Sequence, residues 1–133
     1  MMRRLSGLLA MSLVSLACKR QDGELPPAYR GLAVPETRLQ SADARERGRA
    51  LFLQHCALCH GDRADGRGVR RQGLSSQPRD FTDPAWRART SPRRVFYVIR
   101  EGSPGTAMPA WKVLDDEQTW DVAAYLLAVG GQR

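Results

Sequence analysis

The run Cys56-Ala57-Leu58-Cys59-His60 constrains this chain more than any other part of its sequence. Two thiols three positions apart lie on one turn of a helix, where each can add across one vinyl group of a haem. The histidine that follows then lies under the iron. The pattern C-x-x-C-H therefore predicts one c-type haem, attached through Cys56 and Cys59, with His60 as the proximal ligand. A small domain of this kind uses its cofactor as part of the core.

Two other kinds of site use the same short pattern. A zinc ribbon needs a second pair of ligands at similar spacing, and no cysteine follows Cys59. A thioredoxin-like redox site needs a β-α-β setting, and no strand-like alternation precedes Cys56. Since the second pair of zinc ligands and the β-α-β setting are both missing, we favour the haem interpretation.

Met108 is the predicted sixth ligand of the iron. The proximal histidine fills one axial position of the iron. Outside residues 1–17, the plausible iron ligands that remain are His55 and Met108. His55 directly precedes Cys56 and so lies on the proximal side of the linkage, which leaves Met108. Glycines and prolines over 102–109 predict an irregular loop that can carry a thioether over the iron. The alternative is a methionine that is simply a mobile apolar side chain.

The first seventeen residues predict an export signal. Basic Arg3 and Arg4 precede an apolar run that is too short to span a bilayer, and small residues precede Cys18. Ser15-Leu16-Ala17 satisfies the rule for ordinary signal cleavage. It also resembles a bacterial lipobox, although serine stands where such boxes usually carry leucine. Because haem would take both cysteines of the motif, an unmodified Cys18 would be an odd exported thiol, so we favour its lipidation.

We expect three parts in the chain: a signal peptide at 1–17, a flexible linker or tether at 18–40, and one folded domain at 41–133. The linker has prolines, glycines and mixed charges, with no sustained hydrophobic period, as is typical of a tether. The alternative is an arm that packs on the domain through its apolar side chains, Tyr29, Leu32 and Val34.

Two amphipathic helices frame the predicted domain. Asp43 and Glu46 form a candidate capping box for a helix that runs into the haem motif. Asp115 and Gln118 give the same signature for the last helix, which Gly130-Gly131 ends. Because the last helix is apolar on more than one side, it needs cover on more than one side.

A third helix is expected between these two. Ser91 and Pro92 give its start and Gly102 its end. Its β-branched and aromatic residues would also fit a strand, but a lone strand here has no partner. Residues 83–86 predict one further short turn, and Gly48 would let the aromatic side chains of the last helix approach the first one closely. The fold class predicted is all-α.

The charge of the chain bears on its partners. Its net charge is +7, and all basic residues except Lys19 and Lys112 are arginines. Between Asp62 and Arg94 there are nine arginines and four aspartates. This segment shows no regular alternation of arginine with aromatic residues and the leader predicts export, so we expect no nucleic-acid partner. Two interpretations stay open: a positive surface that docks an acidic redox partner, and a face that is simply solvated.

The order of these motifs over residues 48–129 resembles that of a monohaem class I c-type cytochrome, similar to the electron-transfer cytochrome c subunits or domains associated with terminal oxidases. The stretches that carry the resemblance are 48–52, 56–61, 78–81, 102–111 and 121–126.

The resemblance implies a cytochrome c fold of three to five helices wrapped around one covalently bound haem c. It implies Cys56 and Cys59 as thioether attachments, His60 as proximal ligand and Met108 as distal ligand. One position departs from the pattern: Val69 follows a glycine where many relatives have proline. The backbone carbonyl that orients the proximal imidazole is therefore not assigned by the resemblance.

With both axial positions of the iron filled, we expect a one-electron carrier and not an enzyme, with redox proteins as partners and no small-molecule substrate. It would shuttle electrons between a respiratory donor complex or dehydrogenase and a terminal oxidase or reductase. We expect it on the periplasmic side of a bacterial membrane, lipid-anchored or else soluble in the periplasm. The alternatives are a haem enzyme or ligand sensor with a displaceable Met108, and a haem subunit of a larger oxidoreductase. Arg79 and Trp111 are candidate partners for the haem propionates.

Overall fold

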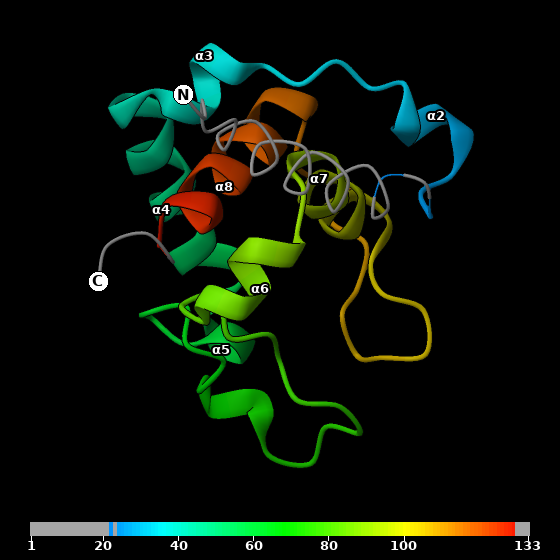
Figure 1. Cartoon of the computed structure of the whole chain (residues 1–133). Helices are drawn as coiled ribbons and strands as arrows, with labels where there is room; N and C mark the ends of the chain where they lie inside the picture. Colours follow the sequence, from blue (N-terminus) through cyan, green and yellow to red (C-terminus); the bar gives the residue numbers. More distant parts are fainter. Residues whose placement is uncertain (1–21, 23, 130–133) are drawn as a thin grey trace, which may run out of the picture.

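The computed structural model describes residue 22 and residues 24–129, and every regular element in this part of the chain is helical (Figure 1). The elements are α2 (Pro27–Arg30), α3 (Glu36–Gln40), α4 (Ala42–His55), α5 (Ala57–His60), the 3₁₀ turn η1 (Val69–Arg71), α6 (Pro84–Arg89), α7 (Pro92–Glu101) and α8 (Asp116–Val129). The all-α prediction is confirmed, and the five α-helices from residue 42 onward agree with the three to five expected. The predicted signal peptide, Cys18 and the Gly130-Gly131 stop lie outside the described residues.

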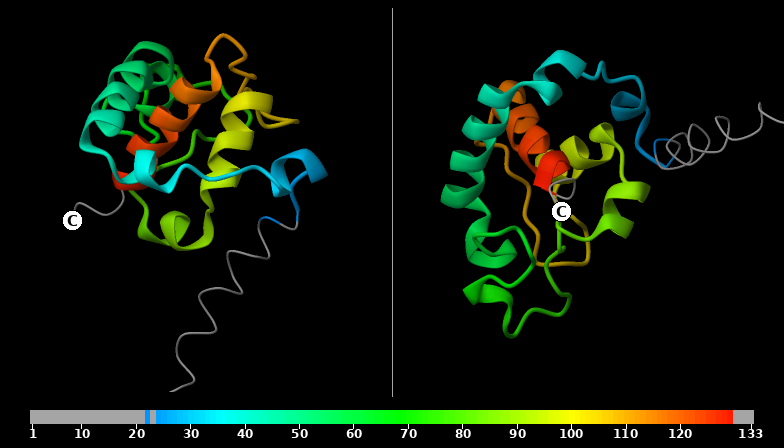
Figure 2. Two further views of the ribbon diagram at one scale, coloured as in Figure 1. Left: turned by 90° about the horizontal axis from the view of Figure 1, so that it is seen from above. Right: turned by 60° about the vertical axis from the view of Figure 1, so that its left-hand side comes forward.

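The two longest helices, α4 and α8, pack side by side (Figures 1 and 2). Gly48 lies at their crossing, where an added Cβ would overlap the backbone of Asp121 and lie 2.9 Å from the nitrogen of Val122. The predicted close approach at Gly48 is therefore present. It is the backbone of α8 that lies against Gly48, however, and not the aromatic side chains that we expected. Only a residue without a side chain allows the helices this separation.

The start of α4 differs from the predicted capping box. The cap is Ser41, whose backbone is extended and whose hydroxyl accepts a hydrogen bond from the Ala44 N–H at 3.3 Å. Asp43 already lies inside the first turn, where its charge favours the helix dipole without capping it. The reason is α3, which ends at Gln40 and leaves Ser41 as the extended link between the two helices.

The other predicted helix starts are confirmed. The Asp115 carboxylate accepts from the Gln118 N–H at 2.8 Å, and the Gln118 side chain accepts from the Asp115 N–H at 3.0 Å, which is a reciprocal capping box. The Ser91 hydroxyl caps α7 by accepting from the Arg94 N–H at 3.1 Å. The segment that a strand would also have fitted is thus a helix. The predicted short turn is α6, capped by Asp83.

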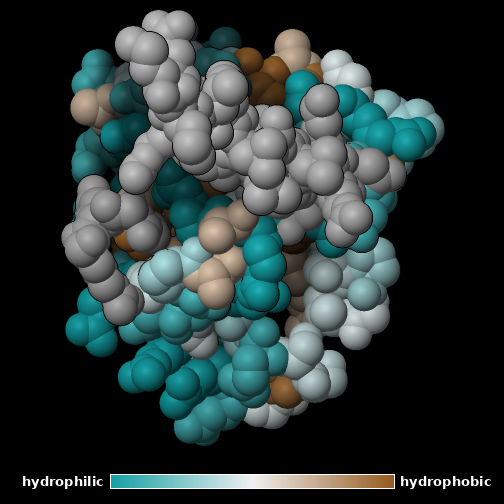
Figure 3. Space-filling model, viewed as in Figure 1, coloured by the Kyte–Doolittle hydropathy of each residue, from teal (hydrophilic) through white to brown (hydrophobic). Residues whose placement is uncertain are grey.

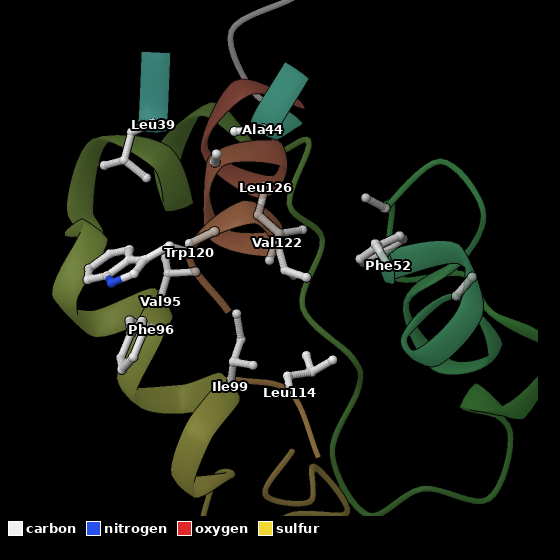
Figure 4. Close-up of a cluster of buried hydrophobic side chains, with 14 residues drawn as sticks. Leu39, Ala44, Phe52, Val95, Phe96, Ile99, Leu114, Trp120, Val122 and Leu126 are labelled. Carbon is white, nitrogen blue, oxygen red and sulfur yellow. The ribbon is translucent and has the colours of Figure 1, made fainter. Parts of the chain in front are cut away.

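The apolar core lies on two sides of α8, which packs against α7 on one side and α4 on the other (Figure 4). The ring of Phe96 on α7 packs on Trp120 of α8, with centroids 4.5 Å apart. Phe52 on α4 is fully buried and contacts Tyr125 of α8, with centroids 5.2 Å apart. Each large apolar side chain buried in this way stabilises the fold by about 1.5–3 kcal/mol. Together they hold α4 against α8 and fix where the haem motif begins.

The segment before α4 differs from the flexible linker expected over 18–40. We call its described residues, 22 and 24–40, the arm. The arm packs on the core through the three side chains of the alternative interpretation, Tyr29, Leu32 and Val34, and it buries Leu25 and Leu39. The physical reason is the broad apolar surface of α7 and α8, which α4 covers only in part.

Ion pairs add to the packing of the arm. Arg93 of α7 pairs with Asp22 at 2.9 Å and donates to the Leu32 carbonyl at 2.7 Å. At the other end, the carboxylate of Asp121 on α8 is buried and binds both Arg38 of the arm and Arg47 of α4, each at 2.8 Å. These contacts hold the arm against α7 and α8, and Arg47 ties α4 to the same carboxylate.

Candidate haem site

The two cysteines of the motif lie at a break between helices. Cys56 ends α4 by donating its N–H to the Phe52 carbonyl at 2.8 Å, and its own carbonyl accepts from the His60 N–H at 2.9 Å, which begins the turn of α5. The thiols of Cys56 and Cys59 are half-buried and form no disulfide. Burial and, to a smaller degree, the neighbouring Cys59 raise the pKa of the Cys56 thiol to about 12. A thiol with a raised pKa is a poor thiolate ligand for a metal ion.

The zinc alternative finds no support in the geometry. Among residues 22 and 24–129, no group of three or more histidine, cysteine, aspartate or glutamate side chains is placed to hold a metal ion. A structural zinc site needs four such ligands.

His60 is buried, and its ring is oriented by a backbone carbonyl. Its Nδ1 lies 3.1 Å from the carbonyl oxygen of Arg79, to which the Nδ1–H donates in the tautomer that this contact favours. Nε2 then keeps its lone pair for a metal. Burial lowers the pKa of His60, and the Arg79 hydrogen bond offsets part of this, so the ring stays neutral as a ligand must be. This is the carbonyl that the sequence left unassigned.

The loop after α5 brings Arg79 to the imidazole. Gly66 donates its N–H to the His60 carbonyl at 2.7 Å, and Gly68 donates to the Cys59 carbonyl at 3.1 Å. A Cβ at Gly68 would overlap the backbone of Leu58 and Cys59, so the loop lies directly against α5. At the far end of this loop, the Phe81 N–H donates a hydrogen bond to the Ala64 carbonyl at 2.8 Å. This bond fixes the position of Arg79, which lies two residues before Phe81.

Aromatic rings surround the imidazole. The centroid of Phe81 lies 4.8 Å from that of His60, and that of Phe52 lies 6.4 Å away. Phe81 in turn packs edge-on against Trp86 of α6 at 4.9 Å. These rings form an apolar wall beside the imidazole, which suits a macrocycle. Phe81 belongs to the 78–81 stretch that carries the sequence resemblance, but nothing in the sequence placed it beside His60.

Met108 lies half-buried in the loop between α7 and α8. The Met108 carbonyl accepts from the Ser103 N–H and the Trp111 N–H donates to the Ile99 carbonyl, at 3.1 and 2.9 Å. The ring of Trp111 packs on His55, with centroids 5.5 Å apart. His55 is next to Cys56 in the chain, so this contact brings the loop to the haem motif. The same contact gives His55 a packing role.

Seven of the nine arginines in the arginine-rich segment fall into two groups. Arg63, Arg67, Arg70 and Arg71 are exposed after α5, on a part of the surface that is mainly hydrophilic in Figure 3. Arg79, Arg89 and Arg94 line a hollow of about 300 Å³ together with Glu24, Trp86 and Thr90.

The residues present thus fit a covalently held haem: two half-buried thiols, a neutral imidazole with a free Nε2, an apolar wall and a methionine loop nearby.

Comparisons with known proteins agree with a haem-binding domain. The family described as cytochrome c oxidase, cbb3-type, subunit III matches residues 43–126, which is more than half of the chain.

Curated relatives carry related names. Cytochrome c55X of Stutzerimonas stutzeri is 36% identical over 86 residues, which cover 60% of this chain and 65% of the relative. The cbb3-type cytochrome c oxidase subunit FixP of Bradyrhizobium diazoefficiens is 30% identical over 88 residues, or 65% of this chain and 28% of the relative. This chain therefore spans under two thirds of the first relative and under a third of the oxidase subunit.

A solved structure shares the fold. The Kuenenia stuttgartiensis reducing HAO-like protein complex contains a chain that matches 74% of this chain and 45% of its own length, with a TM-score of 0.58 and 23% identity. At this identity the likeness concerns the fold alone.

Proposed function

The chain belongs to the family of cbb3-type cytochrome c oxidase subunit III, and from this premise we propose that it is a one-electron carrier with His/Met-ligated haem c. Electron transfer through a covalently bound c-type haem follows from the family itself. The assignment of single residues is our proposal: Cys56 and Cys59 form the thioethers, and His60 and Met108 are the axial ligands.

One observation carries this proposal: the hydrogen bond from His60 Nδ1 to the Arg79 carbonyl. It fixes the ring and its tautomer, so Nε2 presents its lone pair while burial keeps the imidazole neutral. A surface histidine has no need for such a bond. Two half-buried thiols within four residues of the same ring support covalent attachment at this place.

The position of the loop around Met108 supports methionine as the second ligand. Within the described residues, His55 is the one imidazole besides His60, and its ring is occupied by packing on Trp111. Gly102 has a φ of +75°, which glycine adopts readily, and its conformation starts a loop that returns to α4. These observations support Met108 as the donor that we propose for the second axial position.

These residues define the chemistry that the site can perform. Bound haem supplies an iron that takes up and releases one electron. The soft thioether of Met108 favours the reduced state and raises the potential compared with two imidazoles. The rings of Phe52 and Phe81 exclude water from the proximal side. With both axial positions taken by side chains, no position is left for a substrate, which favours a carrier over a haem enzyme or ligand sensor.

We place the carrier on the periplasmic side of a bacterial membrane. The leader at 1–17 directs export, Cys18 carries a lipid, and the cytochrome c domain at 41–133 faces its redox partners. No helix in the described part of the chain is long and apolar enough to span a membrane. The donor is a respiratory complex or dehydrogenase and the acceptor is a terminal oxidase or reductase. The exposed arginines after α5 are a positive surface for an acidic partner.

The ferric spectrum tests the ligand set. Protein made with haem-attachment machinery should show the weak near-infrared sulfur-to-iron band of His/Met haem, and Met108→Ala should lose it. Val113→Ala, which shortens an exposed apolar side chain outside the site, is the control and should keep the band. A high-spin spectrum in the wild type, with rapid binding of carbon monoxide to the reduced protein, would contradict the proposal and favour the enzyme or sensor.

A further inference from the structure

An ion pair joins the two ends of the loop that contains Met108. Glu101 is the last residue of α7 and Lys112 follows Trp111 at the other end of the loop, and their side chains meet at 2.5 Å. Inside this pair, the N–H of Trp111 bonds to the Ile99 carbonyl at 2.9 Å. The loop is therefore closed at its base by one backbone bond and one ion pair.

The arm contributes to the same closure. The Tyr29 hydroxyl of α2 donates to the Glu101 carboxylate oxygen that also binds Lys112. The Tyr29 ring is held edge-on against Tyr97, with centroids 4.9 Å apart, and lies 6.4 Å from Phe96. Since both of those rings belong to α7, the hydroxyl is presented to Glu101 by a packed aromatic side chain.

The charges of this group suit a lasting contact. The hydrogen bonds from Lys112 and from Tyr29 lower the pKa of Glu101, so its carboxylate is ionised at neutral pH. Burial, followed by the bond to Glu101, raises the pKa of Tyr29 to about 12, so the phenol keeps its proton. An isolated Glu101–Lys112 pair would be a surface ion pair of little value, because both side chains are partly exposed. The hydroxyl of Tyr29 turns it into a three-membered group tied to the core.

We propose that Tyr29, Glu101 and Lys112 form a clasp through which the N-terminal arm holds the Met108 loop closed and so positions Met108 as the sixth ligand. This inference rests on the proposed function, since it assumes that Met108 ligates the iron. The three side chains are positioning residues, because they act through the loop. The arm, which the sequence predicts to be a passive tether, is on this account part of the structure that sets the haem ligation.

The test uses the full-length haem-loaded protein and its variant Tyr29→Phe, which removes the hydroxyl and keeps the ring. Cyanide binds ferric haem only when the sixth ligand leaves, so its association rate measures the opening of the loop. Loss of a hydrogen bond to a charged group should raise this rate about tenfold. Glu101→Gln should do the same. Hydrogen exchange at the amides of Ser103 and Trp111 gives a second readout, independent of the haem, and should also become faster.

Tyr97→Phe is the matched control. It removes a hydroxyl from a ring that packs on Tyr29, and this hydroxyl makes no hydrogen bond within the described part of the chain. It should leave both the cyanide rate and the exchange of the loop amides at wild-type values.

The outcomes separate the clasp from the ligand assignment. If the wild type shows the sulfur-to-iron band, but Tyr29→Phe binds cyanide and exchanges its loop amides at the wild-type rates, the clasp is refuted while the His/Met proposal stands. If the wild type lacks the band, the ligand assignment fails, and the positioning of Met108 fails with it. Faster rates in Tyr97→Phe to the same degree as in Tyr29→Phe would also refute the clasp, because the loss of a hydroxyl that does not bind Glu101 would then have the same effect.

Discussion

Replacing Gly48 by alanine should separate the two longest helices of the domain. The added Cβ would overlap the carbonyl of Asp121 and lie 2.9 Å from the nitrogen of Val122. These atoms belong to the backbone of α8 and cannot rotate away, as the end of a flexible side chain could. Either α4 or α8 must therefore move, and the side chains that pack between them lose contacts.

The size of the effect follows from two opposing terms. Overpacking a core costs about 1–3 kcal/mol, and the upper part of this range applies because backbone is met. Alanine recovers up to about 1 kcal/mol through its higher helix propensity. We expect a net loss of about 2 kcal/mol in the free energy of unfolding. For a domain of this size, this lowers the melting temperature by about 8–16 °C.

The assay is guanidinium and thermal unfolding of the haem-loaded protein, followed by far-ultraviolet circular dichroism. Gly31→Ala is the matched control, because Gly31 has an ordinary φ of −87° and its nearest atom to an added Cβ lies 4.0 Å away. It should change the stability by less than about 0.5 kcal/mol. If Gly48→Ala unfolds within about 0.5 kcal/mol of the wild type, the reasoning about the helix crossing is wrong.

Three further perturbations test other parts of the molecule. The double variant Cys56→Ala with Cys59→Ala should be unfolded or degraded because the haem completes the core, and a protease-resistant apo domain would contradict this. Asp121→Asn should lower the free energy of unfolding by about 1–3 kcal/mol, since it leaves two arginines without their buried partner; equal stability in denaturant would show that the ion pairs are unimportant. The hydrogen bonds from Lys112 and Tyr29 lower the pKa of Glu101 below its usual 4.5 in the folded protein. The ionised Glu101 side chain therefore contributes fully to the free energy of unfolding above pH 4.5, and this contribution is lost as the pH falls through the pKa of the folded state. An acid titration of stability should therefore be less steep in Glu101→Gln, and identical curves would refute the assignment.

Much of the fold could be predicted because its signals are local. Ser91 before Pro92 and the pair Asp115 and Gln118 lie next to the helices that they start, and the structure confirms both starts. Start and stop signals, with no partner for a lone strand, also separated the segment over 92–101 from a strand, although its propensities are ambiguous. The cap of α4 was assigned to Asp43 in place of Ser41, because an Asp-x-x-Glu pattern cannot show that a preceding helix ends at residue 40.

Local patterns could not decide whether the arm packs, although its apolar side chains gave the alternative that the structure shows. Prolines, glycines and mixed charges are typical of a tether, yet residues 24–40 pack on the domain. Whether such a segment packs depends on the apolar surface that other helices leave uncovered. That surface exists only after α7 and α8 have come together, so composition carries no information about it.

The sequence by itself determined the chemistry of this protein, because the two thiols and the imidazole of the C-x-x-C-H motif lie within five consecutive residues. A single helical turn is enough to bring them together. The sequence determined the family for the same reason, through short stretches in a specific order. Only the tertiary structure decided what orients those groups. The bond from His60 to Arg79 spans 19 residues, the one from Tyr29 to Glu101 spans 72, and the one from Arg38 to Asp121 spans 83. Contacts at such separations depend on how the whole chain packs, and no local pattern encodes them.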